Sequence, residues 1–125
     1  MIVGTGIDLV EIARVAKIID RYPARFLERI YLPGEMQYCL RKRSSAESFA
    51  ARFAAKEAAA KALGTGIQHG VGWKDIEVIR EPGGRPGLLL HGRAAQIAAR
   101  MRVRTMALSI THTTVYALAQ VLFED

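Results

Sequence analysis

The stretch from Phe49 to Leu63 constrains the fold more than any other part of the sequence, because alanine is its commonest residue. Alanine has the highest helix propensity, and its small side chain lets other elements approach a helix closely. Ser44 and Glu47 stand where a capping box would start this helix, and Gly64 stands where a C-terminal glycine would end it. We therefore predict a long, central and largely buried helix, in which each charged residue needs an explanation.

The residues before this helix predict one strand and several short helices. Residues 1–10 alternate and carry many β-branched side chains, which favours a strand ending near Asp8. From Glu11 the apolar residues follow a helical period until Pro23 interrupts it. The segments that follow are expected to be a short helix carrying Phe26, Leu27 and Ile30, a turn at 32–34 and a helix over 35–41.

The second half of the chain is expected to consist mostly of strands. These are a strand over 73–80, a turn at 81–86, a strand through 88–90, a helix around 93–102, and strands over 105–111 and 115–123 joined near 112–114. Helices grouped early and strands grouped late are typical of α+β domains. We predict a single α+β domain over residues 1–125, with an antiparallel β-sheet packed against the long central helix.

Composition narrows the classes of function. The chain carries 18 Lys and Arg against 12 Asp and Glu, a formal charge of +6, which predicts an anionic partner. No zinc-finger spacing or aromatic RNA-binding signature accompanies the charge, so we expect no nucleic-acid partner. No apolar run approaches the roughly 20 residues that span a bilayer, and the start does not resemble a signal peptide. With a single cysteine, Cys39, these features predict a cytoplasmic protein without membrane association.

Asp8 and Glu57 are the first candidates for chemistry. A carboxylate among alanines in a buried helix is costly without a cation, and Mg²⁺ commonly takes two carboxylates from different elements. Gly4 and Gly6 are expected to leave room for a ligand near the strand that carries Asp8. The alternative is structural: Asp8 caps the next helix, and Glu57 pairs with Lys61 at i,i+4.

Lys61 shares one helix face with Phe53 and Glu57, at i, i+4 and i+8. It could bring an ammonium group to a phosphate beside the metal, or simply favour the C-terminal end of its helix. Lys56 points to a different face, and we expect it to snorkel to the surface or to support the fold.

Two further groups of residues are open to both a functional and a structural interpretation. The backbone N–H groups of Gly64, Thr65 and Gly66 could bind phosphate oxygens, although a plain helix end followed by a turn explains them as well. Ser109, Thr111 and His112 could bind an anionic group, or satisfy hydrogen bonds at a hairpin.

Two motifs together resolve these alternatives. Gly6-Ile7-Asp8 and the later helix from Phe53 to Lys61, with Lys56-Glu57 at its centre, resemble the holo-acyl-carrier-protein synthase branch of the 4′-phosphopantetheinyl transferase superfamily. The resemblance extends through residues 64–66, 84–86 and 109–112. It implies the fold of that superfamily and transfer of 4′-phosphopantetheine from coenzyme A to a serine of apo-acyl carrier protein, in support of fatty acid biosynthesis.

The resemblance also implies a role for each matching residue. Asp8 and Glu57 would hold Mg²⁺ against the coenzyme A pyrophosphate, and Lys61 would steady the same phosphates. Glu57, directly or through a metal-bound water, would take the serine proton. The adenosine and 3′-phosphate would lie among Arg52, Gly64, Thr65, Gly66, Pro86, Ser109, Thr111 and His112.

Partners follow from the same comparison. Arg14, Lys17 and Arg21 form a basic stripe at i, i+3 and i+7, with Arg25 just beyond. By itself such a stripe is an ordinary solvated face, but the resemblance implies that it docks the acidic carrier protein.

The strand over 115–123 shows no clean alternation, so both its faces need covering. A partner subunit would cover one of them, and the resemblance implies a homotrimer with active sites between subunits.

Two other functions remain as alternatives. The chain could be a non-catalytic module that binds coenzyme A, or a basic nucleic-acid-binding module. The second leaves Glu57 within an alanine-rich helix unexplained.

Overall fold

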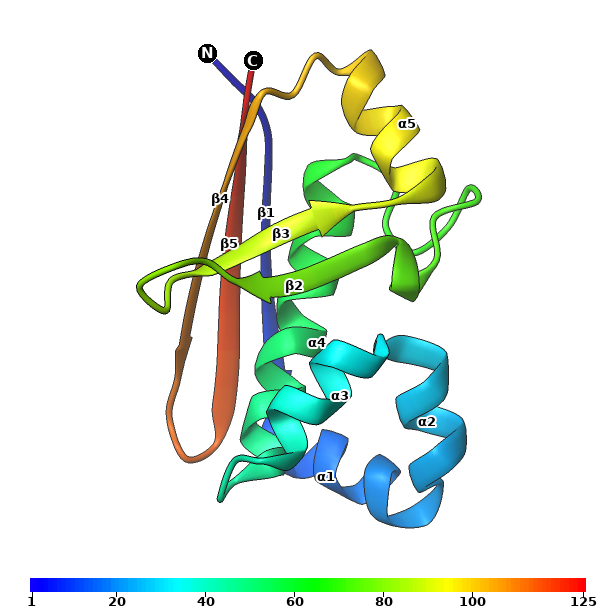
Figure 1. The fold of residues 1–125 in the computed structure, drawn as a ribbon, viewed down its shortest axis with the longest axis vertical. Helices are drawn as coiled ribbons and strands as arrows, with labels where there is room; N and C mark the ends of the chain where they lie inside the picture. The colour runs from blue at the N-terminus through cyan, green and yellow to red at the C-terminus, as the bar shows by residue number, and fades with distance from the viewer.

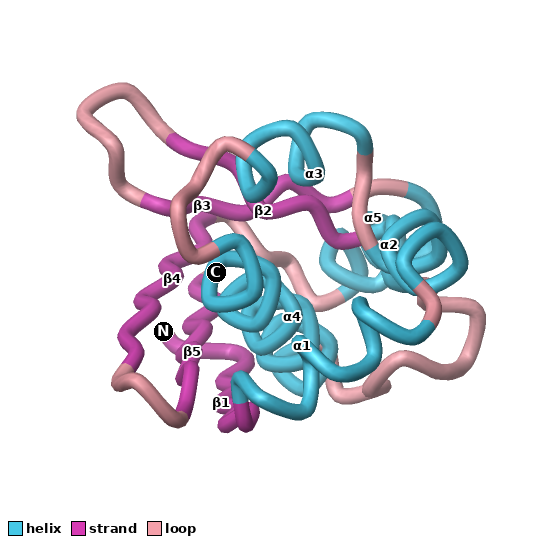
Figure 2. Tube along the Cα trace, turned by 90° about the horizontal axis from the view of Figure 1, so that it is seen from below, coloured by secondary structure: helices cyan, strands magenta, loops and turns pink.

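The central helix α4 (Ser45–Ala62) is the core of the domain in the computed structural model. Its alanines are closed off from solvent, with Ala54, Ala55 and Ala58 each 0% exposed. The helix lies between a three-stranded sheet on one side and the other helices and a β-hairpin on the other (Figures 1 and 2). The prediction of a long, buried, central helix is therefore confirmed.

The main sheet is antiparallel, with the order β1-β5-β4. Its strands are β1 (Ile2–Glu11), β5 (Tyr116–Glu124) and β4 (Thr105–His112). One face packs on α4 through the inward side chains of β5, namely Ala117, Ala119, Val121 and Phe123, all of which are buried. The strand β5 thus alternates more regularly than its sequence indicates. Its other face, with Leu118, Gln120 and Leu122, is covered by no element of this chain.

Two glycines of β1 allow the strand to lie directly on α4. A Cβ atom at Gly4 would lie 2.3 Å from the carbonyl oxygen of Ala62, and one at Gly6 would lie 1.8 Å from that of Ala58. The space beside these glycines is therefore filled by the helix backbone, and the expectation that it admits a ligand is wrong. The close contact instead sets Asp8, two residues after Gly6, beside the middle of α4.

The second layer of strands is the hairpin of β2 (Ile76–Arg80) and β3 (Pro86–Leu90). The predicted strand over 73–80 is too long, because Trp73–Asp75 form a turn of 3-10 helix, η1. Helix α5 (Gly92–Arg100) follows β3 and ends two residues earlier than expected.

Three short helices cover the remaining side of α4: α1 (Ile12–Arg21), α2 (Pro23–Ile30) and α3 (Pro33–Leu40). The prolines at 23 and 33 each occupy a first helical position, where a missing N–H costs nothing. At the start of α3 the side chain of Glu35 accepts a hydrogen bond from the N–H of Leu32 at 2.8 Å. The capping box predicted at Ser44 is absent, because the Ser44 side chain makes no cap hydrogen bond.

Two side chains, one in α3 and one in α4, are notable for their burial. Cys39 in α3 is a free thiol with 0% exposure, and burial raises its pKa to about 11. Lys56 in α4 is also 0% exposed, so it supports the fold and does not snorkel. None of the helices combines the length and apolar character needed to cross a membrane.

Candidate active site

A cleft of about 340 Å³ lies where β1 and α1 meet α4. Asp8 enters it from β1, and Glu57 and Lys61 enter it from one face of α4. The structure therefore brings together the three residues that the sequence predicts for the reaction. The contact of Gly6 with Ala58 is the local reason, since it fixes the distance between strand and helix.

Lys61 holds the polar end of this cleft together. Its Nζ donates to the backbone oxygen of Ile7 at 2.9 Å and to Oδ1 of Asp8 at 3.1 Å. The structural alternatives for Asp8 and Glu57 are wrong, because Lys61 pairs with Asp8 and not with Glu57, and Asp8 lies within β1. Lys61 does lie in the last turn of α4, as its own structural alternative requires. Glu57 is left with no ion-pair partner of its own.

The electrostatics of Glu57 differ from those of an ordinary surface glutamate. Burial raises its pKa above the usual value, and the nearby Asp8 carboxylate raises it further, against a smaller opposing effect of Lys61. A carboxyl group with a raised pKa is a stronger base once ionised. It is also a group that gains from a nearby cation.

The donor set of the cleft fits Mg²⁺. Two carboxylates from different elements point into one open space, and magnesium usually takes one or two carboxylates and fills its other positions with water and phosphate oxygens. No cluster of three or more His, Cys, Asp or Glu side chains that could hold a metal occurs in the structure. The site is thus suited to a metal shared with a phosphate-bearing ligand.

The opposite wall of the cleft is apolar and aromatic. Phe26 of α2 and Phe53 of α4 line it, with ring centroids 6.2 Å apart and planes 22° apart. Trp73 also packs against Phe53, at 4.8 Å between centroids. We call the row Phe26–Phe53–Trp73 the aromatic wall.

A second hollow, of about 240 Å³, lies on another side of α4 and is lined by two arginines, Arg52 and Arg80, and one carboxylate, Glu47; we call it the basic hollow. Three cations surround the ring of Tyr38: Arg52 at 4.0 Å, Lys42 at 4.7 Å and Arg80 at 4.9 Å. Arg80 also donates to the Tyr38 hydroxyl. Burial alone would raise the pKa of Tyr38, but the three neighbouring cations outweigh it and lower the pKa below its ordinary value.

Arg52 is the residue of this basic hollow most suited to an anion. Its side chain is 6% exposed, and its Nε atom is buried without a hydrogen-bond partner. A buried donor of this kind is rare unless a ligand completes it. Pro86 and His112 line the same hollow, so the structure groups three of the residues predicted for the adenosine and 3′-phosphate site.

The remaining predicted contacts lie elsewhere. The N–H groups of Gly64, Thr65 and Gly66 donate to the carbonyls of Lys61 and Ala60, so they end the helix and are not free for phosphate. Gly64 and Gly66 have φ of 82° and 64°, which favours glycine at this helix end. Ser109 and Thr111 are exposed and line neither hollow, although their chain neighbours Ile110 and His112 line the second one, and Ser109 lines a third hollow together with Pro86.

The basic stripe on α1 begins at the cleft. Arg14 lines it beside Asp8 and Glu11, while Lys17, Arg21 and Arg25 continue outward as exposed side chains. The stripe is therefore continuous with the candidate site.

Several residues at or beside the two hollows are not marked by any pattern in the sequence. Tyr38 and Arg80 come from segments far apart in the chain and meet only in the folded domain. Trp73 could have been noticed as the only tryptophan of the sequence, and Glu35 as an acidic residue in the first turn of a short helix.

Two carboxylates and a lysine in one cleft, and an arginine-rich hollow on the same helix, define a protein that handles phosphate-bearing ligands. The chain belongs to the 4′-phosphopantetheinyl transferase superfamily, whose family model matches residues 4–120. The resemblance in the sequence is thereby confirmed.

Relatives of known name cover the whole chain. The holo-[acyl-carrier-protein] synthase of Koribacter versatilis is 57% identical over 125 residues, and that of Solibacter usitatus is 53% identical over 125 residues, with full coverage of both chains in each case.

Solved structures are similar to this chain in both fold and sequence. The Helicobacter pylori holo-[acyl-carrier-protein] synthase in complex with coenzyme A has a TM-score of 0.84 and 32% identity, over 96% of this chain and 99% of that one. The Bacillus anthracis enzyme in complex with CoA (3′,5′-ADP) has a TM-score of 0.81 and 38% identity, over 98% and 96% of the two chains. The predicted fold class is confirmed.

Proposed function

We propose that this protein transfers 4′-phosphopantetheine from coenzyme A to a serine of apo-acyl carrier protein. The observation that carries the proposal is the meeting of Asp8, Glu57 and Lys61 in one cleft. The names of the relatives support it, as do the coenzyme A complexes of similar structures. The products are holo-acyl carrier protein and adenosine 3′,5′-bisphosphate.

The reaction is a substitution at phosphorus. The serine oxygen forms a bond to the phosphorus that carries pantetheine, and the bond from that phosphorus to the bridging pyrophosphate oxygen breaks. The electron pair of the broken bond leaves with adenosine 3′,5′-bisphosphate. Glu57, directly or through a water molecule, accepts the serine proton. Lys61 exchanges part of its contact with Asp8 for a phosphate oxygen and stabilises charge on the leaving group.

Asp8 and Glu57 would together hold Mg²⁺ beside this pyrophosphate. The ion would neutralise phosphoryl oxygens and orient the reacting groups when bound. Without such a cation, burial and then the neighbouring Asp8 carboxylate raise the pKa of Glu57. The two carboxylates would also repel an anionic substrate.

The coenzyme A site would be shared between subunits of a homotrimer. Positions 52 and 57 of α4 differ by five residues and so face directions about 140° apart around the helix. The basic hollow around Arg52 and the acidic cleft around Glu57 accordingly lie on different sides of one chain. A neighbouring copy could bring its Arg52 hollow to the first copy's cleft, so that one coenzyme A contacts both.

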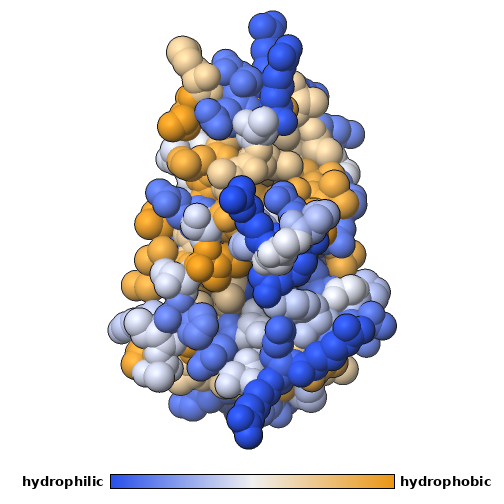
Figure 3. Space-filling model, turned by 60° about the vertical axis from the view of Figure 1, so that its left-hand side comes forward, coloured by the Kyte–Doolittle hydropathy of each residue, from blue (hydrophilic) through white to orange (hydrophobic).

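The uncovered face of the main sheet supports this assembly. Ile7 and Leu9 on β1 are 55% and 59% exposed, and they pair across the sheet with Gln120 and Leu118. Hydrophobic surface gathers on the side of the molecule that carries β4 (Figure 3). Exposed apolar surface of this kind marks a site of protein association. Gln120 lies at the centre of this face, between Ile7 and Ser109 on the flanking strands.

The carrier protein would dock along the basic stripe Arg14, Lys17, Arg21 and Arg25. Its acidic surface would be drawn to these charges, and Arg14 would set its serine near the cleft. A cytoplasmic location would follow from both substrates.

The proposal is tested by incubating the protein with apo-acyl carrier protein, coenzyme A and Mg²⁺ and measuring the mass of the carrier. We expect the mass to rise by one phosphopantetheine, and to remain unchanged with Asp8→Asn. A protein that binds coenzyme A but never modifies the carrier would be the non-catalytic module instead.

A further inference from the structure

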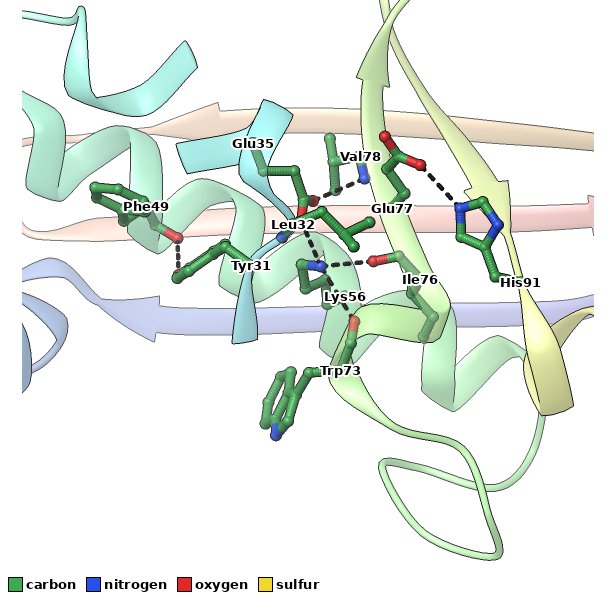
Figure 4. Close-up of polar contacts among 10 residues, drawn as sticks. All are labelled: Tyr31, Leu32, Glu35, Phe49, Lys56, Trp73, Ile76, Glu77, Val78 and His91. Atoms are coloured by element: carbon green, nitrogen blue, oxygen red, sulfur yellow. Dashed lines mark hydrogen bonds and ion pairs between the residues drawn. The ribbon is translucent and has the colours of Figure 1, made fainter. Parts of the chain in front are cut away.

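Lys56 is completely buried in α4, directly before Glu57 in the sequence, yet it has no place in the reaction described above. Its Nζ donates three hydrogen bonds: to Oε1 of Glu35 at 2.8 Å, to the backbone oxygen of Ile76 at 2.6 Å and to that of Trp73 at 3.1 Å (Figure 4). An ammonium group has three N–H donors, so the hydrogen-bonding capacity of Lys56 is fully used.

Glu35 is equally well satisfied and is 2% exposed. Its Oε1 accepts from Lys56 and from the N–H of Leu32, and its Oε2 accepts from the N–H of Val78 at 2.9 Å (Figure 4). The pair therefore ties α4 to the start of α3, to the turn η1 and to β2.

Stability alone does not explain such a pair. Two buried charges cost several kcal/mol each in desolvation, and neutral residues of similar volume are often as stable or more stable. Burial lowers the pKa of Lys56, against the opposing effect of Glu35, which reflects this cost. An apolar pair could not supply the hydrogen bonds to the backbone of Leu32, Val78, Ile76 and Trp73, and of these four residues Trp73 is the one whose side chain packs on a residue of the cleft.

The hydrogen bond from Lys56 to Trp73 connects the buried pair to the candidate active site. The Trp73 backbone oxygen accepts from Lys56 and from the N–H of Ile76. The Trp73 indole packs against Phe53, which lines the cleft next to Phe26. Trp73 itself has no other side-chain hydrogen bond to hold it, so its position depends on its backbone and on ring packing.

We propose that Lys56 and Glu35 are positioning residues that fix the aromatic wall of the cleft through the backbone oxygen of Trp73. The inference rests on the proposed function, because it concerns the cleft in which transfer would occur. Loosening the wall displaces Phe53 relative to Glu57, one turn further along the same helix. Small displacements of this kind are enough to reduce the rate of a reaction that depends on orientation.

The test is the double variant Lys56→Met with Glu35→Gln, which removes both charges together and leaves no unpaired ion. We expect the variant to keep its far-UV circular dichroism and a melting temperature near that of the wild type. We expect kcat/KM for the carrier to fall by about tenfold. The affinity for coenzyme A should change less than twofold, because Arg52 and Lys61 are untouched.

Fluorescence gives a readout that a purely structural role would not move. Trp73 is the only tryptophan in the chain, so its emission reports on this position alone. In the double variant we expect emission shifted to longer wavelength and stronger quenching by acrylamide. The matched control is Lys74→Met, which removes an exposed lysine beside Trp73 that makes no hydrogen bond, and it should leave both measurements as in the wild type.

A folded double variant with wild-type quenching and wild-type carrier kinetics would overturn the inference. If the double variant does not fold, Lys56→Leu with Glu35→Gln, which also removes the donor to the Trp73 oxygen, is measured in the same way, with the same result overturning the inference. The quenching experiment requires no activity. Its outcome therefore separates a failure of this inference from a failure of the proposed transfer reaction.

Discussion

Gly6 and Ala58 stand so close that a Cβ atom on the first would lie 1.8 Å from the carbonyl oxygen of the second. This contact sets the spacing between β1 and α4, and with it the spacing between the carboxylate of Asp8 and the side chains of Glu57 and Lys61. Geometry at the site thus depends on a residue that has no side chain.

Gly6→Ala should therefore impair both stability and activity. The new methyl group meets backbone, which cannot rotate away, so we expect a loss of at least about 2 kcal/mol in the free energy of unfolding. Chemical denaturation measures the loss. Gly34→Ala in α3 is the control, because a Cβ there meets nothing within 4 Å, and alanine in a helix should be neutral or slightly stabilising. Equal effects at both positions would contradict the tight contact at Gly6.

Glu57→Gln should abolish transfer and yet stabilise the metal-free protein. Because the pKa of Glu57 is raised on folding, the folded protein retains a proton that the unfolded chain has released. The stability that protonated Glu57 contributes is therefore lost as the pH rises from the ordinary glutamate pKa through the pKa in the folded protein, and above that pKa it is lost completely. Melting curves in EDTA between pH 4 and pH 8 should show this decline in the wild type and a flatter profile in Glu57→Gln.

With Mg²⁺ present, the wild type should be more stable than Glu57→Gln, the reverse of the order expected in EDTA. Added Mg²⁺ should raise the melting temperature of the wild type, since a ligand that binds the folded state stabilises it. Glu57→Gln should gain little. An equal gain in both proteins would remove Glu57 from the metal site.

Arg52→Gln should weaken coenzyme A binding by about tenfold or more, because a charge-assisted hydrogen bond contributes roughly 1.5–3 kcal/mol. The buried Nε of Arg52 has no partner within the chain, so a phosphate is expected to complete it. Calorimetric titration with coenzyme A measures the effect. Arg104→Gln, an exposed arginine outside the basic hollow, is the control and should bind normally.

Reversal of Arg14 and Arg21 to Glu should raise the KM for the carrier with little change in the KM for coenzyme A. The two side chains are exposed along α1, and Arg14 borders the cleft. The effect should diminish at high salt, because exposed charges are screened. Equal changes in both constants, or none, would exclude the stripe as the docking surface.

Gln120→Glu should weaken assembly. In a homotrimer with Gln120 near the symmetry axis, the variant would bring like charges together in a desolvated interface. Light scattering at micromolar concentration should then show smaller particles, and activity should fall with them. Gln37→Glu, on an exposed position of α3, is the control. A fully active wild-type monomer would refute the trimer.

The sequence predicted most of what depends on local pattern. The alanine-rich helix, the interruption at Pro23, and the shared face of Phe53, Glu57 and Lys61 all follow from period and propensity. The turn predicted at 32–34 is wrong, because Pro33 is already the first residue of α3. The capping box predicted at Ser44 does not form. Its sequence motif expresses only a preference, and the backbone at Ser44, with ψ of 72°, has another conformation.

Features that depend on contacts between distant residues could not be predicted in this way. The packing of Gly4 and Gly6 on α4 was misread as space for a ligand, because a sequence does not say what fills the gap beside a glycine. The Lys56–Glu35 pair joins positions 21 residues apart, and neither residue marks its partner. The amides of Gly64–Gly66 were similarly ambiguous until their acceptors were known.

Because Cys39 is buried, its reaction with a thiol reagent reports local opening of the protein. Only a thiol that reaches solvent reacts with a labelling reagent, and the raised pKa leaves little thiolate to react at neutral pH. The rate of labelling under native conditions therefore measures how often α3 separates from α4. Tyr38, the neighbour of Cys39 in the chain, lines the basic hollow. A ligand bound in that hollow should therefore slow the labelling of Cys39. The decrease in labelling rate would report ligand occupancy without any assay of turnover.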